Sequence, residues 1–310
     1  MDELLRFLLR ERPPVVEATE LAQFWASTAE VRRRFALPFD RAVAGGRVAD
    51  RLGFAFASGY EAALHALVPA LPPDAIAGFS VTEEHGNHPR NIQARLERNA
   101  DGHLLSGKKR WTTMGPLSDV LVVVAATGEV TEGRPELRAA LVPRDARGLS
   151  VLEMPATAFV PEVPHAELVL ERVSVAESAV LPGDGYADYV KPFRTVEDVH
   201  VNAAVLGYWL SVAVRNGWPD TLLERLSAAV ATLRTVASLD PRRAETHVVL
   251  SGLLEQMGEL AGAAEPSWSL ASDTERERWY RDRVLTQVAS KARQRRRERA
   301  FADLHGARSA

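Results

Sequence analysis

The sequence predicts an α+β protein in which an N-terminal helical domain, a central β domain and a C-terminal helical bundle follow one another. Three observations predict this order. Apolar residues recur every three to four positions in the first part of the chain, short Val- and Leu-rich segments separated by turn residues fill the middle, and helical spacing then returns. We expect a barrel-like or sandwich-like middle domain, with domains over 1–76, 77–185 and 186–310.

The first domain is predicted to be helical because its leucines lie on one helix face. Leu4 and Leu8 are one such pair, and Leu64 and Leu67 are another. A proline cluster that begins at Pro69 ends the last of these helices. A pair of adjacent glycines at 45–46 predicts a turn or a helix break.

The middle domain is predicted to contain short strands. Its segments are rich in Val and Leu and are bounded by Gly, Pro, Asn and Asp, as strands in antiparallel sheets are. The clearest predicted strands are 117–126, 137–142, 149–152 and 166–170.

The C-terminal domain is predicted to contain long helices interrupted by prolines, over 222–236, 246–260 and 274–299. The last of these carries a basic run, KARQRRRER, at 291–299. A basic run can mark a nucleic-acid surface, but this one has no interleaved aromatic residues, and positive charge suits the C-terminal end of a helix dipole. We therefore expect no nucleic-acid partner.

Composition excludes several classes of protein. The 310 residues are 46% hydrophobic and 25% charged with a net charge of −3, which is ordinary for a globular chain. The absence of cysteine excludes disulfides, thiol nucleophiles and cysteine metal sites. No stretch approaches the length of apolar chain that a membrane helix needs, and we expect a cytoplasmic protein with no membrane partner.

Two motifs stand at the start of the β domain. Residues 79–83 read FSVTE, and residues 107–124 read GKKRWTTMGPLSDVLVVV. Later pieces follow in the same order, namely Leu-Val-Pro at 141–143, Gly-Leu at 148–149, AELVLERVSV at 166–175 and Gly-Asp-Gly at 183–185.

This ordered set resembles the acyl-CoA dehydrogenases, and the chain is similar to a shortened, divergent member of that family. The resemblance implies an FAD cofactor, whose isoalloxazine edge would be hydrogen-bonded by Thr82 and, near N5 and O4, by Thr113. It implies that Trp111 packs against the ring and that Phe79 and Val81 contribute main-chain or packing contacts. Taken singly, these residues are also common strand residues, but as an ordered set they favour a flavin wall.

The loop after the first motif departs from the family. It reads Glu-His-Gly-Asn-His-Pro at 84–89, where the family has a Gly- and Ser-bearing stretch that approaches the flavin pyrophosphate. By resemblance, Gly86 and His88 remain as the contacts there, and Arg90 is a further candidate for phosphate. The two histidines of this loop lack carboxylate partners, so we predict no metal site.

The proposed catalytic base rests on a similar alignment. Most family members carry a glutamate within a Tyr-Glu-Gly-Thr segment near the C-terminus, which this chain lacks. A smaller group carries it on the first C-terminal helix, ten residues before a glycine, and Glu197 precedes Gly207 by ten. Glu197 is the candidate base, although an exposed glutamate on a helix face is an equally good interpretation. Asp198 stands where the family has arginine.

The resemblance leaves three functions open. The first is FAD-dependent α,β-dehydrogenation of an acyl-CoA or other acyl thioester, with an electron-transfer partner possible. The second is a flavin-dependent monooxygenase or oxidase of the same fold. The third is a non-catalytic binding protein, which the loss of the family's Arg-x-x-Phe-Gly motif favours. The resemblance also implies a homo-oligomer.

Overall fold

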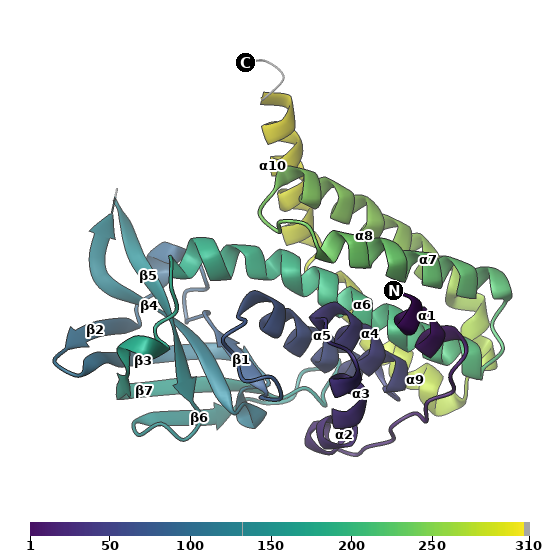
Figure 1. The fold of residues 1–310 in the computed structure, drawn as a ribbon, viewed down its shortest axis with the longest axis horizontal. Coiled ribbons are helices and arrows are strands. Elements are labelled where there is room, and N and C mark those ends of the chain that lie inside the picture. The colour runs from purple at the N-terminus through teal and green to yellow at the C-terminus, as the bar shows by residue number, and fades with distance from the viewer. Residues whose placement is uncertain (132, 307–310) are drawn as a thin grey trace. The chain divides into compact units, whose positions relative to one another are not determined.

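The computed structural model describes residues 1–131 and 133–306 and contains two compact units. The helical unit contains Met1–Ala66, Ala158–Glu162 and the chain from Thr195 onward, and the sheet unit contains Leu67–Thr157 and Val163–Arg194. Helices come first along the chain, then a curled sheet that forms a half-barrel, then helices again (Figure 1). The predicted α+β fold class is therefore confirmed.

Most of the N-terminal helices bury apolar residues, either on one face or around most of the helix. They are α1 Asp2–Leu9, α2 Leu21–Ser27, α3 Ala29–Arg34, α4 Pro38–Val48 and α5 Leu52–Leu67. Phe24 of α2 stacks on Phe54 of α5 with ring centroids 4.7 Å apart, and both rings are fully buried. This stacking attaches α2 to α5.

Seven strands form one sheet in the described part of the chain. They are β1 Ala77–Ser80, β2 Arg95–Asn99, β3 Gly102–Thr113, β4 Val120–Thr131, β5 Arg134–Pro143, β6 Leu149–Glu153 and β7 His165–Val175. The spatial order is β1-β4-β2-β3-β7-β6, with β5 paired to β4. The four strands that the sequence predicted most clearly correspond to β4, β5, β6 and β7.

The sheet contains both parallel and antiparallel strand pairs, and burial alternates along β7 but is continuous along β1 and the first part of β4. β1 runs parallel to β4, with Phe79 opposite Val122, whereas β3 runs antiparallel to both β2 and β7. Buried residues of β2, β3, β4, β5 and β7 form one apolar cluster that includes Leu96, Leu105 and Leu168. A strand whose apolar set faces such a core cannot slip by one residue without exposing it, so the register is fixed.

The C-terminal helices follow a one-turn π-helix at Gly185–Val190. They are α6 Lys191–Arg215, α7 Asp220–Ala237, α8 Ala244–Ala264, α9 Asp273–Asp282 and α10 Ser290–Gly306. Short 3-10 turns lie at Pro89–Asn91, Gly115–Leu117, Glu177–Ala179, Glu265–Leu270 and Arg283–Gln287. No helix among the described residues is long and apolar enough to cross a membrane.

The single long helix predicted over 274–299 is wrong. The chain is helical in α9, makes a 3-10 turn over Arg283–Gln287 and becomes helical again in α10. Asp282, at the end of α9, is fully buried and accepts a hydrogen bond from the backbone N–H of Val160 at 2.7 Å. A tertiary contact therefore fixes the end of α9, which local helical spacing does not reveal.

The adjacent glycines Gly45 and Gly46 lie inside α4 and form neither a turn nor a helix break, so that prediction is also wrong. A Cβ atom on Gly46 would lie 1.9 Å from the carbonyl oxygen of Ala204 in α6. On the facing helix, a Cβ on Gly207 would lie 2.1 Å from the carbonyl oxygen of Val43. The glycines let α4 and α6 approach at backbone distance.

Candidate functional site

Trp111 is presented to solvent by a bulge in β3. The β3–β7 ladder shifts between Lys109 and Thr112, so that three steps on β3 match two on β7. Trp111 sits in this bulge with a φ of 58° and is 50% exposed. Its indole contacts His165 edge-on, with ring centroids 5.9 Å apart. Such a φ costs a bulky residue about 1–3 kcal/mol and is found most often at functional sites.

Two threonines flank this indole. Thr82 follows β1, and its carbonyl oxygen accepts a hydrogen bond from the backbone N–H of Arg110 at 2.8 Å, which brings it beside Trp111. Thr113 ends β3 opposite His165 in the ladder. Both threonine side chains are half-buried, and neither hydroxyl bonds to another residue in the part of the chain that the structure describes. They are free to bond to a ligand heteroatom.

Phe79 and Val81 lie behind this surface. Phe79 is 8% exposed and packs edge-on against Phe193, with ring centroids 4.8 Å apart. Val81 is 7% exposed, and its carbonyl oxygen accepts a hydrogen bond from Nζ of Lys109 at 3.3 Å. The structure therefore places these two residues where they support the strand by packing, with Thr82 as the more accessible member of the motif.

A buried ion pair holds the loop that follows β1. Nζ of Lys109 lies 2.7 Å from Oε1 of Glu83, and the lysine is fully buried. The same carboxylate accepts hydrogen bonds from the backbone N–H groups of Gln93 and Ala94, at 2.8 and 3.1 Å. Burial lowers the pKa of Lys109, while the Glu83 carboxylate opposes that shift. The pair ties both ends of the loop to β3.

Gly86 and His88 lie within that loop. Gly86 forms a reciprocal backbone pair with Glu83, at 3.1 and 3.0 Å, and adopts a φ of 92° that favours glycine. A Cβ at Gly86 would meet no atom within 4 Å, so its backbone faces open space. His88 is exposed, and its Nδ1 accepts a hydrogen bond from the backbone N–H of Arg90 at 3.3 Å. His88 is therefore accessible to an anion, whereas the N–H of Gly86 is already bonded to Glu83.

Glu197 lies on α6 in the helical unit and is half-buried. Its neighbour Asp198 is 6% exposed and is bonded by two arginines of α10. Arg293 lies 2.7 Å from one carboxylate oxygen of Asp198, and Arg296 lies 2.6 Å from the other. The additional negative charge beside the candidate base is therefore neutralised inside the helical unit, by residues that the sequence placed only in a basic run.

Comparison with known proteins agrees with this arrangement of strands and motifs. Residues 78–173 match the acyl-CoA dehydrogenase middle domain. The probable acyl-CoA dehydrogenase YngJ of Bacillus subtilis is 26% identical over 148 residues, which are 47% of this chain and 39% of that protein. The protein is acyl-CoA dehydrogenase-like.

The fold of this acyl-CoA dehydrogenase-like chain extends the match beyond the middle domain. The prolyl acyl carrier protein oxidase AnaB is 15% identical, with a TM-score of 0.68 over 98% of this chain and 97% of that one. The FAD complex of PigA is also 15% identical, with a TM-score of 0.66 over 97% of this chain and 96% of that one. At these identities the likeness establishes the fold, including its helical ends.

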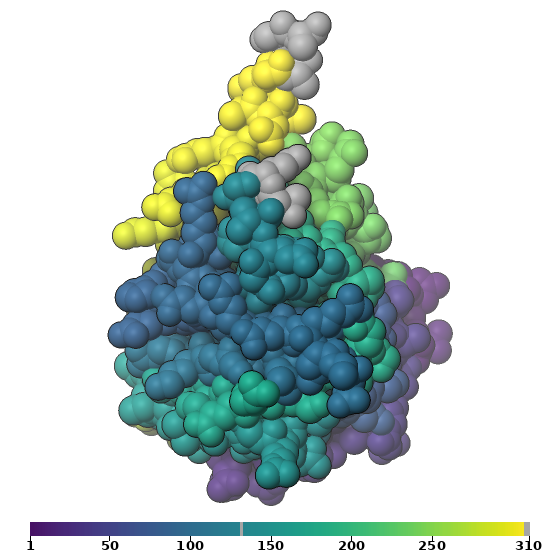
Figure 2. Space-filling view, turned by 90° about the vertical axis from the view of Figure 1, so that its left-hand side faces the viewer, coloured from purple at the N-terminus to yellow at the C-terminus, as the bar shows by residue number. Residues whose placement is uncertain are grey.

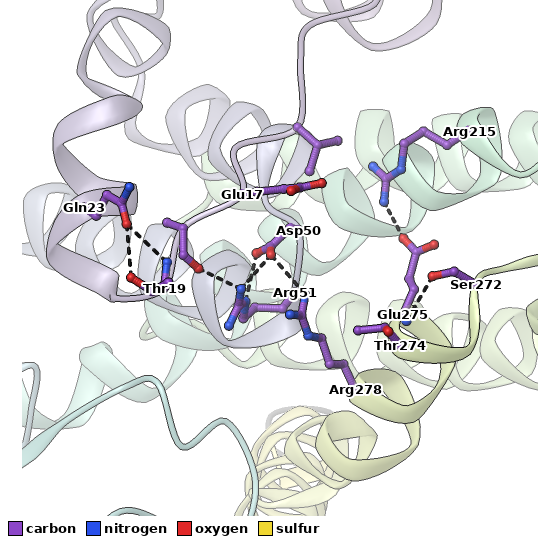
Figure 3. A pocket seen from close by; sticks show the side chains of 12 residues that line it. Glu17, Thr19, Gln23, Asp50, Arg51, Arg215, Ser272, Thr274, Glu275 and Arg278 are labelled. Carbon is purple, nitrogen blue, oxygen red and sulfur yellow. Dashed lines mark hydrogen bonds and ion pairs between the residues drawn. The ribbon is translucent and has the colours of Figure 1, made fainter.

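A separate polar pocket of about 670 Å³ lies within the helical unit of the acyl-CoA dehydrogenase-like protein (Figure 3). Three arginines line it, but each has a carboxylate partner. Asp50 binds Arg51 at 2.7 Å and Arg278 at 3.0 Å, and Glu275 binds Arg215. None of the residues that the sequence singled out lines this pocket.

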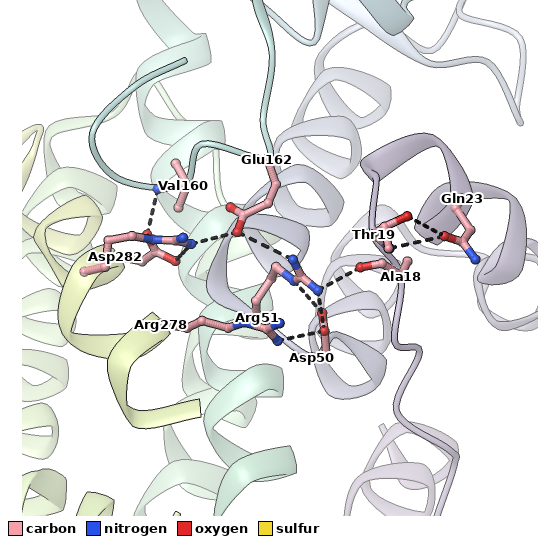
Figure 4. Close-up of polar contacts among 10 residues, drawn as sticks. Ala18, Thr19, Gln23, Asp50, Arg51, Val160, Glu162, Arg278 and Asp282 are labelled. Carbon is pink, nitrogen blue, oxygen red and sulfur yellow. Dashed lines mark hydrogen bonds and ion pairs between the residues drawn. The ribbon is translucent and has the colours of Figure 1, made fainter. Parts of the chain in front are cut away.

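A chain of ion pairs fixes the segment between β6 and β7 that belongs to the helical unit (Figure 4). Arg281 pairs with Glu162 and with the buried Asp282, each at 2.7 Å. Arg51 lies 3.7 Å from the same Glu162 carboxylate. Asp282 also accepts the Val160 N–H described above. Because Asp282 is fully buried, these contacts define the position of this segment.

Sequence reasoning missed the Glu83–Lys109 pair for a definable reason. In a regular strand, Lys109 and Trp111 would lie on the same face, because side chains alternate with a period of two. The bulge inserts one residue between them, which turns Lys109 inward and Trp111 outward. No local signal in the sequence marked that bulge.

Proposed function

We propose that this protein is an FAD-dependent oxidoreductase that acts on an acyl thioester. The observation that carries the proposal is the half-exposed indole of Trp111, held in a bulge beside the unbonded hydroxyls of Thr82 and Thr113. A flat aromatic face next to two hydroxyls suits a flavin ring, which has a planar body and a polar edge. The exposed imidazole of His88 and the space beside Gly86 leave room for a phosphate group in the loop that follows β1.

Each residue of this wall has a definite role in the proposal. Thr82 and Thr113 would bond to the edge of the ring, Trp111 would cover one side of it, and His88 would contact the pyrophosphate. Bound FAD would supply the acceptor for a hydride from the β carbon of the substrate. The buried Glu83–Lys109 pair keeps the loop and β3 in register, so that the threonines and the indole hold fixed positions.

We propose that Glu197 removes the α proton of the thioester. A carboxylate is a competent general base when it is ionised and within reach of the proton. Arg293 and Arg296 support this role because they neutralise Asp198, so that Glu197 has no uncompensated carboxylate next to it. Glu197 would hold the α proton, and FAD, when bound, would supply the acceptor for the hydride, which balances the two-electron oxidation.

The substrate class follows from the relatives. YngJ is named as an acyl-CoA dehydrogenase and AnaB as a prolyl acyl carrier protein oxidase, so the thioester is borne either by coenzyme A or by a carrier protein. The acceptor of the electrons is then either an electron-transfer flavoprotein or oxygen. We also propose a cytoplasmic homo-oligomer on the ground of family resemblance.

The first test is the visible absorbance of the purified protein after incubation with FAD and gel filtration. We expect retained flavin absorbance in the natural protein and a loss of about tenfold or more in FAD affinity in Thr82→Val/Thr113→Val, from two hydrogen bonds. Thr127→Val, also a strand threonine, is the matched control and should retain FAD. A colourless protein that rejects FAD would refute the proposal and favour a non-catalytic binding protein.

The second test concerns the base. Glu197→Gln should bind FAD normally but reduce flavin in the presence of acyl thioesters about 10²–10⁴-fold more slowly, the range expected for loss of a general base. Glu224→Gln, an exposed glutamate on α7, is the control. An unchanged rate of flavin reduction in Glu197→Gln would remove Glu197 from the mechanism.

An oxidase or monooxygenase is the second candidate, because the structure of the prolyl acyl carrier protein oxidase AnaB matches nearly the whole chain. The same flavoprotein preparation distinguishes it. Oxygen consumption coupled to substrate oxidation identifies an oxidase, and oxygen incorporation into the product identifies a monooxygenase. Reoxidation only by an electron-transfer flavoprotein identifies a dehydrogenase.

A further inference from the structure

The basic run at the end of the chain is divided by the structure into two faces of α10. One face is internal. Arg293 and Arg296 bind the buried Asp198, Arg296 also donates to Oγ1 of Thr195 at 3.3 Å, and Arg293 donates to the carbonyl oxygen of Thr286 at 2.7 Å. These two arginines attach α10 to α6 and need no external partner.

The other face carries a stripe of exposed positive charge. Lys291, Arg295 and Arg299 are exposed, lie four residues apart, and make no hydrogen bond or ion pair with any residue that the structure describes. At about 1.5 Å of rise per residue, the stripe is about 12 Å long. The helix, yellow in the space-filling view, presents much of its length to solvent (Figure 2).

Acids of α10 offset the charge of the stripe only in part: Glu298 lies three residues from Arg295 and Asp303 four residues from Arg299, but neither forms an ion pair with these arginines among the described residues. Like charges four residues apart repel each other, and Lys291 lies in the first turn of α10, where the helix dipole disfavours a cation. A basic residue at the C-terminal end of a helix would be stabilising, but the stripe begins at the opposite end. The positive charge of the stripe therefore contributes little to the stability of α10 and is available to bind an acidic partner.

The surroundings of the stripe favour an acidic protein over other polyanions. A helix that enters a membrane surface needs several large apolar residues beside its basic face. The residues three and four positions from Arg295, its neighbours on the helix surface, are Lys291, Ala292, Glu298 and Arg299, and the exposed Val288 lies three residues before Lys291. A surface for single-stranded nucleic acid needs aromatic residues on which bases stack, and 291–299 contains none. Carboxylates spaced along a facing helix match charges spaced four residues apart.

We propose that the stripe of Lys291, Arg295 and Arg299 docks an acidic acyl carrier protein, which delivers the acyl thioester. Carrier proteins are small acidic helical proteins that hold their acyl group on a phosphopantetheine arm. This proposal rests on the proposed function, which gives the substrate as an acyl thioester, and it narrows the bearer of that thioester to a carrier protein in place of coenzyme A. Its geometric support is that the opposite face of α10 is bonded to Asp198, the residue next to the proposed base Glu197.

The test is the affinity of the full-length protein for a recombinant acyl carrier protein in its apo and phosphopantetheinyl forms, measured at low and high salt. We expect binding of both forms that weakens with salt. Lys291→Gln/Arg295→Gln/Arg299→Gln should weaken it about tenfold, from three exposed charge pairs. Arg98→Gln/Arg225→Gln/Arg243→Gln removes the same charge elsewhere and should leave it unchanged.

Several outcomes would overturn the proposal. These are no binding of either carrier form, equal loss in the two triple variants, or binding of a DNA duplex or of phosphatidylglycerol vesicles without binding of the carrier. If the stripe variant does not fold, Arg295→Gln alone should weaken binding about twofold, and an unchanged affinity would count against the stripe. Because the apo carrier bears no thioester, its binding tests docking separately from flavin retention, which tests the proposed function.

Discussion

Burial of His200 in α6 should make the free energy of unfolding depend on pH. His200 is 4% exposed, its Nδ1 lies 2.7 Å from the carbonyl oxygen of Val196, and its ring packs edge-on against Phe39 at 6.2 Å. Burial lowers the pKa of His200 from 6.5 to about 4, against the opposing effect of the Val196 hydrogen bond. The folded protein therefore keeps this ring neutral where the unfolded chain would protonate it.

The sign and size follow from proton linkage. Between pH 6.5 and about 4 the unfolded chain binds the extra proton, so the free energy of unfolding falls as the pH falls through this window. The difference between the two pKa values of His200 corresponds to about 3 kcal/mol in the free energy of unfolding, at ~1.4 kcal/mol for each pH unit. His200 supplies its full contribution above pH 6.5 and none of it below about pH 4.

Urea unfolding followed by circular dichroism across this window measures the effect. In His200→Leu the decline in the free energy of unfolding between neutral and acid pH should be smaller than in the natural protein by about 3 kcal/mol. His85→Gln, which changes an exposed histidine, should keep the natural slope. If His200→Leu kept that slope as well, the histidine would be protonated in the folded protein and the argument from burial would be wrong.

Three further predictions concern packing and charge. Lys109→Met should lower the free energy of unfolding by about 3–5 kcal/mol because it leaves the Glu83 carboxylate buried without its cation, and Glu83→Gln added to it should restore part of that loss in urea unfolding. Gly46→Ala should destabilise the helical unit by on the order of several kcal/mol, because the added methyl group overpacks the contact between α4 and α6. In Gly252→Ala the added methyl group meets nothing within 4 Å, so this variant should stabilise α8 by about 0.5–1 kcal/mol. Thermal unfolding measures both changes. Asp198→Asn should loosen α10, seen as faster amide exchange and earlier proteolysis in that helix, and unchanged protection would contradict the assigned ion pairs.

The candidate site was predictable from sequence where its residues are local in the chain. The resemblance of the FSVTE and GKKRWTT segments to the acyl-CoA dehydrogenases grouped Thr82, Trp111 and Thr113, and in the structure the bond between Arg110 and Thr82 joins the two segments. The outward turn of Trp111 was not predictable, because it depends on a bulge in the pairing of β3 with β7.

The limits of sequence reasoning appear most clearly where a residue's role depends on a distant partner. Adjacent glycines read as a helix break, yet Gly46 serves the approach of α4 to α6, a contact that spans more than half of the chain. The continuous helical spacing over 274–299 was real, but Asp282 bonds to Val160 and the helix ends there.

By itself the sequence determined the order of helical and strand segments, the position of four strands and the resemblance to the acyl-CoA dehydrogenases, because periodicity and short motifs are properties of neighbouring residues. Only the tertiary structure decided which charges are internal and which are exposed. Asp198 and Arg293 are 95 residues apart in the chain and form one ion pair. Burial and pairing of charges depend on such distant contacts. Some arginines of the basic run therefore form internal ion pairs with Asp198, and others are exposed on the surface of α10.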